Sequence, residues 1–275
     1  MDIRRYMYSP VQNLAVWVAA WLAEVEPTDS LLGAFRDIGG SHEVVGGGEL
    51  TDLLRMMRAY GVSHRRRSLA ATGETPSTWF ELPLVSLLMA GPGQAPVTPA
   101  SAEGAVIARA LVQGDLGGLA VHGIGQSLYL VPEEKDGAMV WSVFETKDAP
   151  RGVAPLLPGD ADHALAESTR NAALQIDAAG YRFPDSTRID PLLTVGTLTD
   201  YYDLPGVPET TPVRATQLFA RADRVSAIIE TLLDRVGDHS LDPYLLPLWA
   251  HIRNARIAGV DYAAREWFKR AGRNQ

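Results

Sequence analysis

The chain has 275 residues, of which 46% are hydrophobic and 21% are charged, so it can bury a core and lacks the composition of a disordered protein. It contains no cysteine, which excludes disulfides, thiolate metal sites and a cysteine nucleophile. Arginine outnumbers lysine 22 to 3, as a GC-rich coding bias produces, and we expect a bacterial source.

The net charge of −8 is spread unevenly along the chain. Residues 1–213 carry 15 basic and 26 acidic side chains (−11), whereas residues 214–275 carry 10 and 7 (+3). An acidic chain does not draw in nucleic acid by long-range attraction, so a nucleic-acid partner is not favoured. The apolar run from Leu14 to Ala23 is about half of the roughly 20 residues that a membrane span needs. We expect a cytoplasmic protein that does not enter a membrane.

Two helices are predicted near the N-terminus. The first covers residues 10–25, where Ser9 and Gln12 have the spacing of a capping box. Apolar residues lie on nearly all sides of this helix, so we expect it at the centre of the fold. A second helix is predicted over residues 29–38, with Gly39 closing it in the left-handed conformation.

The stretch DIGGSHEVVGGGELTDLLRMM, residues 37–57, combines five glycines, a His-Glu pair and a helix start. Glycines before a helix suggest phosphate binding, but the acidic first turn here would repel a phosphate. His42 and Glu43 begin a zinc-protease motif whose second histidine position is occupied by Gly46. We therefore interpret the stretch as a joint, with a short strand over residues 41–45 and a flexible turn into the next helix.

That next helix is predicted from about Glu49 to Tyr60, with Gly61 as its terminator. The basic run that follows is interpreted as an edge strand within HRRRSLAA, in which alternate arginines face opposite sides and do not form one patch. Its members are also candidate binding residues for a phosphate, a nucleic-acid backbone or an acidic partner. They are His64, Arg65, Arg66 and Arg67.

The middle of the chain contains short β-like runs broken by glycine and proline, which predict a small mixed or antiparallel sheet. A strand is predicted in STWFELPLVSLLM, residues 77–89, and a helix in TPASAEGAVIARALV, residues 98–112. The clearest signal is a hairpin over about residues 127–145, with the turn signal Lys135-Asp136-Gly137 between its strands.

From about residue 158 the chain is predicted to be helical. One helix is capped by Asp160, runs to Ala179 and stops at Gly180. Residues 181–212 contain prolines and tyrosines and are predicted to form a surface connection.

The strongest predicted helix opens at Thr211-Pro212 and carries a narrow apolar seam that ends at Gly237. Another helix starts at Asp242-Pro243. We expect the two helices to pack as an antiparallel pair, with three apolar residues of the second helix on the seam. These are Leu245, Trp249 and Ile252.

The predicted fold class is α+β, with N-terminal helices and a small sheet followed by a helical C-terminal part. We place the boundary so that residues 1–157 form the α+β part, and residues 158–275 form the mainly helical part packed against it.

The segment GDADHALAE brings four possible metal ligands together on about two turns of helix. They are Asp160, Asp162, His163 and Glu167. Carboxylate and imidazole ligands can hold a divalent metal, or the His-Glu pair can act as acid and base. The alternative is that the aspartates stabilise the helix start while the other two form an exposed pair. A metal titration that leaves the melting temperature unchanged would remove the metal hypothesis.

The sequence carries no complete catalytic motif and specifies no cofactor. The main hypothesis is therefore a non-enzymatic binding or assembly protein, in which a protein partner or a second copy of the chain docks on the apolar seams of the helices. An enzyme, or a small-molecule or metal binder, with its site between the two parts near Asp160, Asp162 and His163 is the alternative. Nucleic-acid or acidic-partner binding through residues 65–67 comes third, and predicts an association that weakens steeply with salt.

Overall fold

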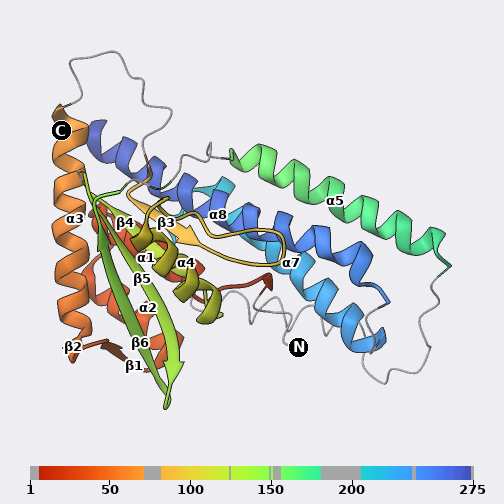
Figure 1. Ribbon diagram of the computed structural model, residues 1–275. Helices are drawn as coiled ribbons and strands as arrows, with labels where there is room; N and C mark the ends of the chain where they lie inside the picture. The colour runs from red at the N-terminus through yellow and green to blue at the C-terminus, as the bar shows by residue number, and fades with distance from the viewer. Residues whose placement is uncertain are drawn as a thin grey trace.

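The computed structural model describes residues 6–70, 82–123, 125–148, 150, 156–180, 206–236 and 240–273. Within them it has seven helices and a six-stranded mixed sheet, so the predicted α+β class is confirmed (Figure 1). The helices are α1 Val11–Leu22, α2 Thr28–Gly39, α3 Leu50–Ala70, α4 Ala102–Gln113, α5 Pro158–Ala178, α7 Val213–Val236 and α8 Asp242–Arg273. The strands are β1 Ser41–Val44, β2 Gly48–Glu49, β3 Val85–Leu88, β4 Gly118–His122, β5 Ser127–Lys135 and β6 Ala138–Thr146.

The strands form one sheet in the order β2-β1-β6-β5-β4-β3. β1 pairs with β6 in parallel, and every other neighbouring pair is antiparallel. α1, α2 and α3 pack on one face of the sheet, whereas α4 packs on the other face over β4 and β5. The hairpin of β5 and β6 pairs nine residues of each strand, and its turn holds Asp136 and Gly137 at φ 53° and 78°. The predicted hairpin is therefore confirmed.

α1 lies at the centre of the N-terminal part, as its sequence predicts. Eleven of its 12 residues are buried. The predicted capping box is wrong, because the Gln12 side chain does not return to the start of the helix. Its amide oxygen accepts a hydrogen bond from Arg256 and its amide nitrogen donates one to Asn13. The Ser9 hydroxyl does accept a hydrogen bond from the Val11 amide at 3.1 Å, so only half of the predicted arrangement is present.

The glycine-rich stretch is a joint between α2 and α3, as predicted. Gly40 rather than Gly39 takes the positive φ of 66° that ends α2, and β1 follows directly. Gly46 and Gly47 turn the chain into β2. Their φ angles are 98° and 94°, a conformation that residues with side chains rarely adopt. The Asp52 carboxylate accepts a hydrogen bond from the Glu49 amide at 3.1 Å, which lowers the pKa of Asp52 and fixes the start of α3. A carboxylate therefore already occupies the position that a phosphate would need.

His42 is held in place by both of its ring nitrogens. Nδ1 lies 3.0 Å from the Trp141 indole nitrogen, which can only donate, so Nδ1 accepts and the proton is on Nε2. Nε2 then donates to the Phe35 carbonyl oxygen at 2.7 Å. Burial, opposed by this hydrogen bond, lowers the pKa of His42 below its ordinary value of 6.5. Neither nitrogen is available to a metal.

We expect the His42→Gln variant to lose part of the pH dependence of stability. The unfolded chain protonates His42 below the ordinary pKa of 6.5 while the folded chain resists protonation, so stability falls as the pH drops through that value. Glutamine can make both hydrogen bonds without titrating. The free energy of urea unfolding should therefore change less between about pH 8 and pH 5.5 than in the wild type. His163→Gln, at a side chain that is 82% exposed, should keep the wild-type slope, and equal slopes in both variants would contradict the expectation.

α3 extends well beyond its predicted end at Tyr60. Gly61 does not terminate the helix, because its role is close packing: a Cβ there would lie 3.0 Å from Leu22 Cδ2 of α1. The segment HRRRSLAA is consequently helical as far as Ala70, and the predicted edge strand containing residues 64–67 is wrong. The arginines are good helix formers, and no β-branched residue in the run favours a strand.

The predictions for α4 and β3 agree with the structure where residues are described. α4 begins at Ala102 rather than at the predicted Thr-Pro, and the Ser101 hydroxyl caps it by accepting a hydrogen bond from the Gly104 amide at 3.3 Å. β3 lies within the predicted strand of residues 77–89, of which residues 77–81 are outside the described residues.

The C-terminal part consists of α5, α7 and α8. α5 starts at Pro158, with Leu157 at the cap position, so the predicted capping role of Asp160 is wrong. Gly180 follows the end of α5 at φ 72°, as predicted. Residues 181–205 of the predicted connection and the predicted stop at Gly237 lie outside the described residues.

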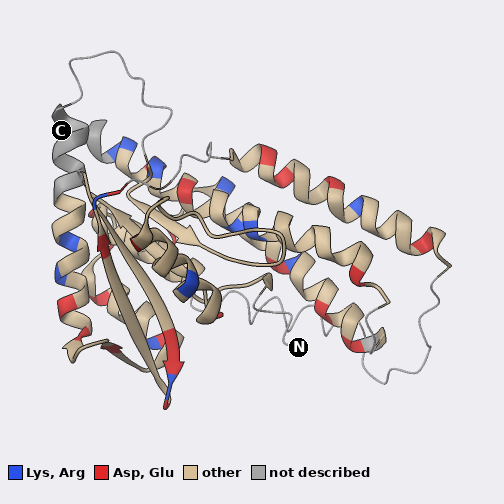
Figure 2. Cartoon of the chain, in the orientation of Figure 1, with Lys and Arg blue, Asp and Glu red and all other residues tan. Residues whose placement is uncertain are grey.

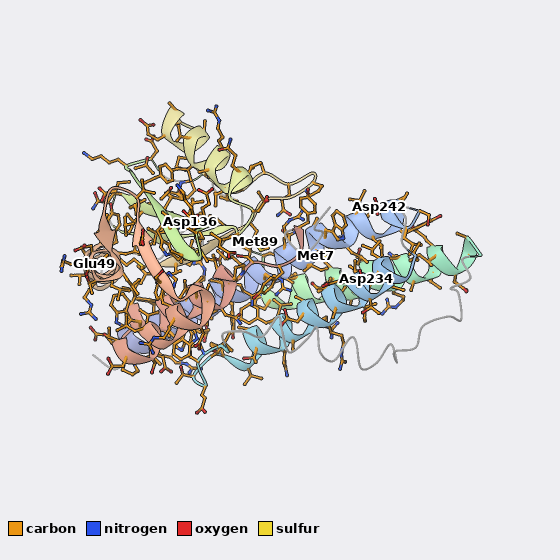
Figure 3. All side chains as sticks on the ribbon, turned by 90° about the horizontal axis from the view of Figure 1, so that it is seen from below. Met7, Glu49, Met89, Asp136, Asp234 and Asp242 are labelled. Atoms are coloured by element: carbon orange, nitrogen blue, oxygen red, sulfur yellow. The ribbon has the colours of Figure 1, made fainter. Side chains whose placement is uncertain are left out.

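α7 and α8 form the predicted antiparallel pair. Asp234 near the end of α7 and Asp242 at the start of α8 lie at the same end of the molecule (Figure 3). Their shared apolar core contains the seam of α7 and the three expected residues of α8. It includes Leu218, Ala222, Val225, Ile229, Leu245, Trp249 and Ile252.

α8 is one continuous helix of 32 residues that contacts both parts of the chain. Its first half packs against α5 and α7. Its second half packs against α1 through Val260, Ala263, Ala264 and Trp267. Among the described residues, no helix is long and apolar enough to cross a membrane.

Candidate functional site

The structure does not gather the four predicted metal ligands of α5. Asp162 Oδ1 lies 2.9 Å from Arg221 Nε of α7, and this ion pair turns Asp162 toward the neighbouring helix. His163 and Glu167 lie 4.0 Å apart on the exposed side of α5. Across the part of the chain that the structure describes, no group of three or more histidine, aspartate or glutamate side chains is placed to hold a metal. Metal binding at these residues stays a prediction.

The second predicted site, at residues 64–67, lies in the last turns of α3. The side chains of these four residues are outside the described part of the structure. Binding of nucleic acid or an acidic partner there also stays a prediction.

A groove of about 1000 Å³ lies between α5 and α7. These two helices run in the same direction, and both pack chiefly against α8, which runs the opposite way (Figure 1). The α5 side of the groove has no large side chain and is lined by Gly159, Asp162, Ala166 and Thr169. The α7 side extends from Arg214 to Ile228, a distance of about 21 Å along the helix axis. The groove is therefore long enough to take about four turns of another helix.

Three arginines of α7 line this groove, namely Arg214, Arg221 and Arg224. Arg221 is paired with Asp162 across the groove. Arg214 and Arg224 are exposed, and neither makes an ion pair or hydrogen bond with any residue in the described ranges. The charged residues lining the groove thus sum to +2, in a chain whose net charge is −8. Along α5, in contrast, four acidic residues accompany a single arginine (Figure 2).

Apolar side chains accompany the arginines. Leu218 and Val225 form the buried floor of the groove, and Ile228 at one end is 38% exposed. Near the other end, where α5 and α7 both begin, Leu157 is 58% and Val213 is 69% exposed. The groove thus combines an apolar floor with arginines and with exposed apolar side chains near its two ends.

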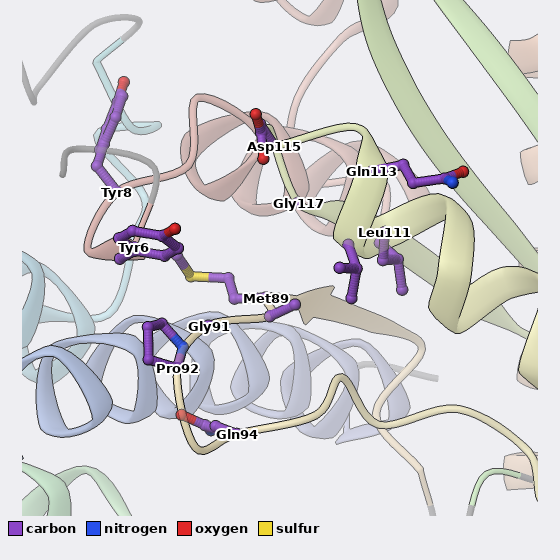
Figure 4. Close-up of a pocket in the computed structure, with 12 residues that line it drawn as sticks. Tyr6, Tyr8, Met89, Gly91, Pro92, Gln94, Leu111, Gln113, Asp115 and Gly117 are labelled. Carbon is purple, nitrogen blue, oxygen red and sulfur yellow. The ribbon is translucent and has the colours of Figure 1, made fainter. Parts of the chain in front are cut away.

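A second hollow, of about 520 Å³, lies where the N-terminal segment meets the end of β3 and the end of α4. Tyr6 and Pro92 lie on one side of it, and Leu111 and Gln113 of α4 lie on the other (Figure 4). The Tyr6 ring stacks on Trp249 of α8 with the ring centres 5.4 Å apart, so this wall is fixed to the helical part. We call this hollow the junction pocket.

Arg253 of α8 connects the walls of the junction pocket by hydrogen bonds. Its guanidinium is fully buried and donates to the Tyr6 carbonyl at 2.7 Å, the Pro92 carbonyl at 3.3 Å and the Gln94 side-chain oxygen at 3.1 Å. Burial lowers the pKa of Arg253 to about 10. A Cβ on Gly91 would lie 2.3 Å from the guanidinium, so only glycine lets the chain approach this closely. Because the donors of Arg253 are bound to two main-chain carbonyls and to Gln94, its role in the pocket is to fix the walls.

The described residues also contain a buried serine, histidine and aspartate close together. His122 contacts the Ser127 hydroxyl through Nδ1 at 2.8 Å and the Ser86 hydroxyl through Nε2 at 3.3 Å. The Asp261 carboxyl in turn interacts with the Ser86 side chain. A hydrolytic triad needs the carboxylate on the histidine instead, and here His122 is only 3% exposed. This arrangement satisfies polar groups in the core.

Sequence reasoning identified the buried seam of α7 but missed the groove beside it, whose floor shares Leu218 and Val225 with the seam. The signal was present, because Arg214, Arg221 and Arg224 recur at steps of seven and three and so share one face of the helix. What the sequence does not give is the position of α5, whose small residues leave that face open. The junction pocket carried no such signal, since Arg253 lies about 250 positions from the Tyr6 carbonyl it binds.

The chain is an α+β protein whose helical part carries a groove lined by three arginines and by apolar side chains. Two family models match it: "Rv1486c-like protein, N-terminal domain" over residues 11–155 and "Rv1486c-like protein, C-terminal domain" over residues 159–257. The first alone spans more than half of the 275 residues, and the chain belongs to the Rv1486c-like protein family.

A curated relative supports this assignment. The chain is similar to the uncharacterized protein ML1804 of Mycobacterium leprae (strain TN), with 25% identity over 310 aligned positions that cover 93% of this chain and 97% of the relative. The expected bacterial character agrees with this bacterial relative. No solved structure matches the chain.

Proposed function

We propose that the protein is a non-catalytic binding protein that holds a helix of a protein partner in the groove between α5 and α7. The observation that carries the proposal is the groove itself, about 1000 Å³ in volume, with an apolar floor and with the partly exposed Ile228 at one end. An amphipathic helix binds such a groove by placing its apolar face between the two flanking helices.

The groove's shape favours a helix over an extended peptide. α5 and α7 both lie on α8, so a third helix placed between them would pack against two parallel neighbours, as in a helical bundle. The exposed positions of α7 recur every three or four residues, which is the spacing that a packed helix needs. An extended peptide would instead require an open sheet edge or a row of free main-chain groups.

A photo-crosslinking experiment tests the proposal. A benzophenone amino acid at Gln217, inside the groove, should crosslink to a protein partner in a mycobacterial host, whereas the same group at the exposed Arg170 of α5 should not give that product. The Ala166→Trp variant, which fills the groove, should abolish the product, because the indole occupies the space of the partner helix.

Glu167→Trp is the matched control, since it adds the same side chain at the next residue, outside the groove. It should leave crosslinking intact, and melting temperatures should show that both variants fold. A product that survives Ala166→Trp would argue against the groove as the docking site. A product of twice the mass of the chain would point to a second copy of the protein, the oligomer that the sequence also suggests, in place of a different partner.

A further inference from the structure

We infer that the helix bound in the α5/α7 groove is acidic, with carboxylates spaced to meet Arg214, Arg221 and Arg224. This inference rests on the proposed function, because it specifies the chemistry of the same occupant. In addition, it names the arginines that select the partner and the spacing of the carboxylates that they bind. It also identifies Asp162 of the protein as a competitor of the partner's carboxylates.

Charge complementarity is the first argument. Two exposed arginines of the groove, Arg214 and Arg224, make no ion pair with any of the described residues, and both flank the apolar floor. Docking an apolar or basic helix would partly desolvate these guanidinium groups without a partner, at a cost in affinity. A helix with glutamates on the edges of its apolar face would instead pair with them by charge-assisted hydrogen bonds.

The spacing of the arginines gives the second argument. Positions 214, 221 and 224 rise about 10 Å and then about 5 Å along the axis of α7. A partner helix that lies nearly parallel to α7 has the same rise per residue, so acidic residues at relative positions 1, 8 and 11 fall opposite the arginines. Leucines at the intervening three- and four-residue steps then face Leu218 and Val225.

Asp162 gives the third argument, because its carboxylate already pairs with one of the three arginines. It reaches from α5 to Arg221 at 2.9 Å, and both side chains of the pair are about two-fifths exposed. A partner carboxylate that contacts Arg221 must therefore share the guanidinium with Asp162 or displace it. Removing the charge of Asp162 should free Arg221 and strengthen the binding of an acidic helix.

The test uses two synthetic, fluorescently labelled helical peptides of about 18 residues with the same leucines. One carries glutamate at the three positions opposite the arginines, and the other carries glutamine there. Fluorescence anisotropy measures the dissociation constant of each peptide for the full chain at low and high salt. We expect the glutamate peptide to bind about tenfold more tightly than the glutamine peptide at low salt, and this preference to shrink as salt screens the charges.

Three variants connect that preference to the groove. Arg214→Gln with Arg224→Gln should remove most of the tenfold preference, whereas Arg109→Gln, an exposed arginine of α4 outside the groove, should not change it. Asp162→Asn should tighten binding of the glutamate peptide by about two- to fivefold and leave the glutamine peptide unchanged. A gain of this kind is not expected from a variant that only weakens the packing of α5 on α7.

The outcomes separate this inference from the proposed function. If both peptides bind equally and Ala166→Trp abolishes both, the groove is a docking site but its partner is not selected by acidity. If neither peptide binds, the helix-docking function fails together with the inference. If a single-stranded oligonucleotide displaces the glutamate peptide with higher affinity, the arginines serve a nucleic acid, and both conclusions are overturned.

Discussion

Replacing Arg256 by methionine is expected to lower the free energy of unfolding by about 3–5 kcal/mol. Arg256 is fully buried, and its Nη1 lies 2.6 Å from the Asp223 carboxylate, which is only 6% exposed. The same guanidinium donates to the Met7 carbonyl at 2.7 Å, to Gln12 at 2.8 Å and to Ser226 at 3.3 Å. The variant leaves Asp223 charged in the core and these acceptors without their donor, and both effects are costly.

A double variant separates the loss of the charge pair from the loss of packing. Asp223→Leu together with Arg256→Met removes both charges, so it should be more stable than Arg256→Met alone by about 1–2 kcal/mol. Chemical unfolding followed by tryptophan fluorescence measures the wild type, the two single variants and the double variant. Strictly additive destabilisation, or a loss below about 1 kcal/mol for Arg256→Met, would show that the pair is not the buried unit described above.

Replacing Asp261 by asparagine is expected to stabilise the protein at high pH by about 1–3 kcal/mol. Burial raises the pKa of Asp261 from 3.8 to about 7, although Arg265 and Ser86 favour its charged form. One carboxyl oxygen is buried and accepts no hydrogen bond from the residues that the structure describes. The folded protein therefore holds the proton more tightly than the unfolded chain, and stability falls as the pH rises from about 4 through 7. Asparagine is neutral at every pH in this range and avoids the loss.

The gain from Asp261→Asn should therefore depend on pH. At about pH 8 the variant should be more stable than the wild type, and at about pH 5, where the wild-type carboxyl is protonated in the fold, most of the difference should disappear. Glu133→Gln removes an exposed carboxylate of β5 and serves as the matched control, with little expected change at either pH. A difference that is the same at both pH values would contradict the raised pKa.

Local patterns predicted those parts of the fold in which neighbouring residues decide the structure. The hairpin turn at Asp136 and Gly137 needs two positive φ angles in succession, and few other residue pairs supply them. The seam of α7 likewise follows from periodicity alone. The error at Gly61 is of the opposite kind. Gly61 does not end the helix. A glycine is present there because Leu22 of another helix packs close to it, and the sequence does not show that contact.

The candidate site depends almost entirely on tertiary placement. Asp162 looked like a metal ligand because it has a histidine as its neighbour in sequence, yet its partner in the structure is Arg221, 59 positions away. The arginines of the groove share one face of α7 in the sequence, but the sequence does not show what lies opposite that face. Their significance depends on the small side chains of α5, which keep the opposite wall of the groove low.

The continuity of α8 couples the unfolding of the two hydrophobic cores. One helix supplies Trp249 to the core beneath α5 and α7, and Trp267 to the core beneath α1. Both cores contain residues of α8, so unfolding of one core disrupts the packing of the other. The two cores should therefore unfold in a single cooperative transition. The amide protons in the middle of α8 should then exchange with solvent only by global unfolding. For the same reason, a fragment cut near residue 157 would leave the N-terminal part without the helix that closes its core.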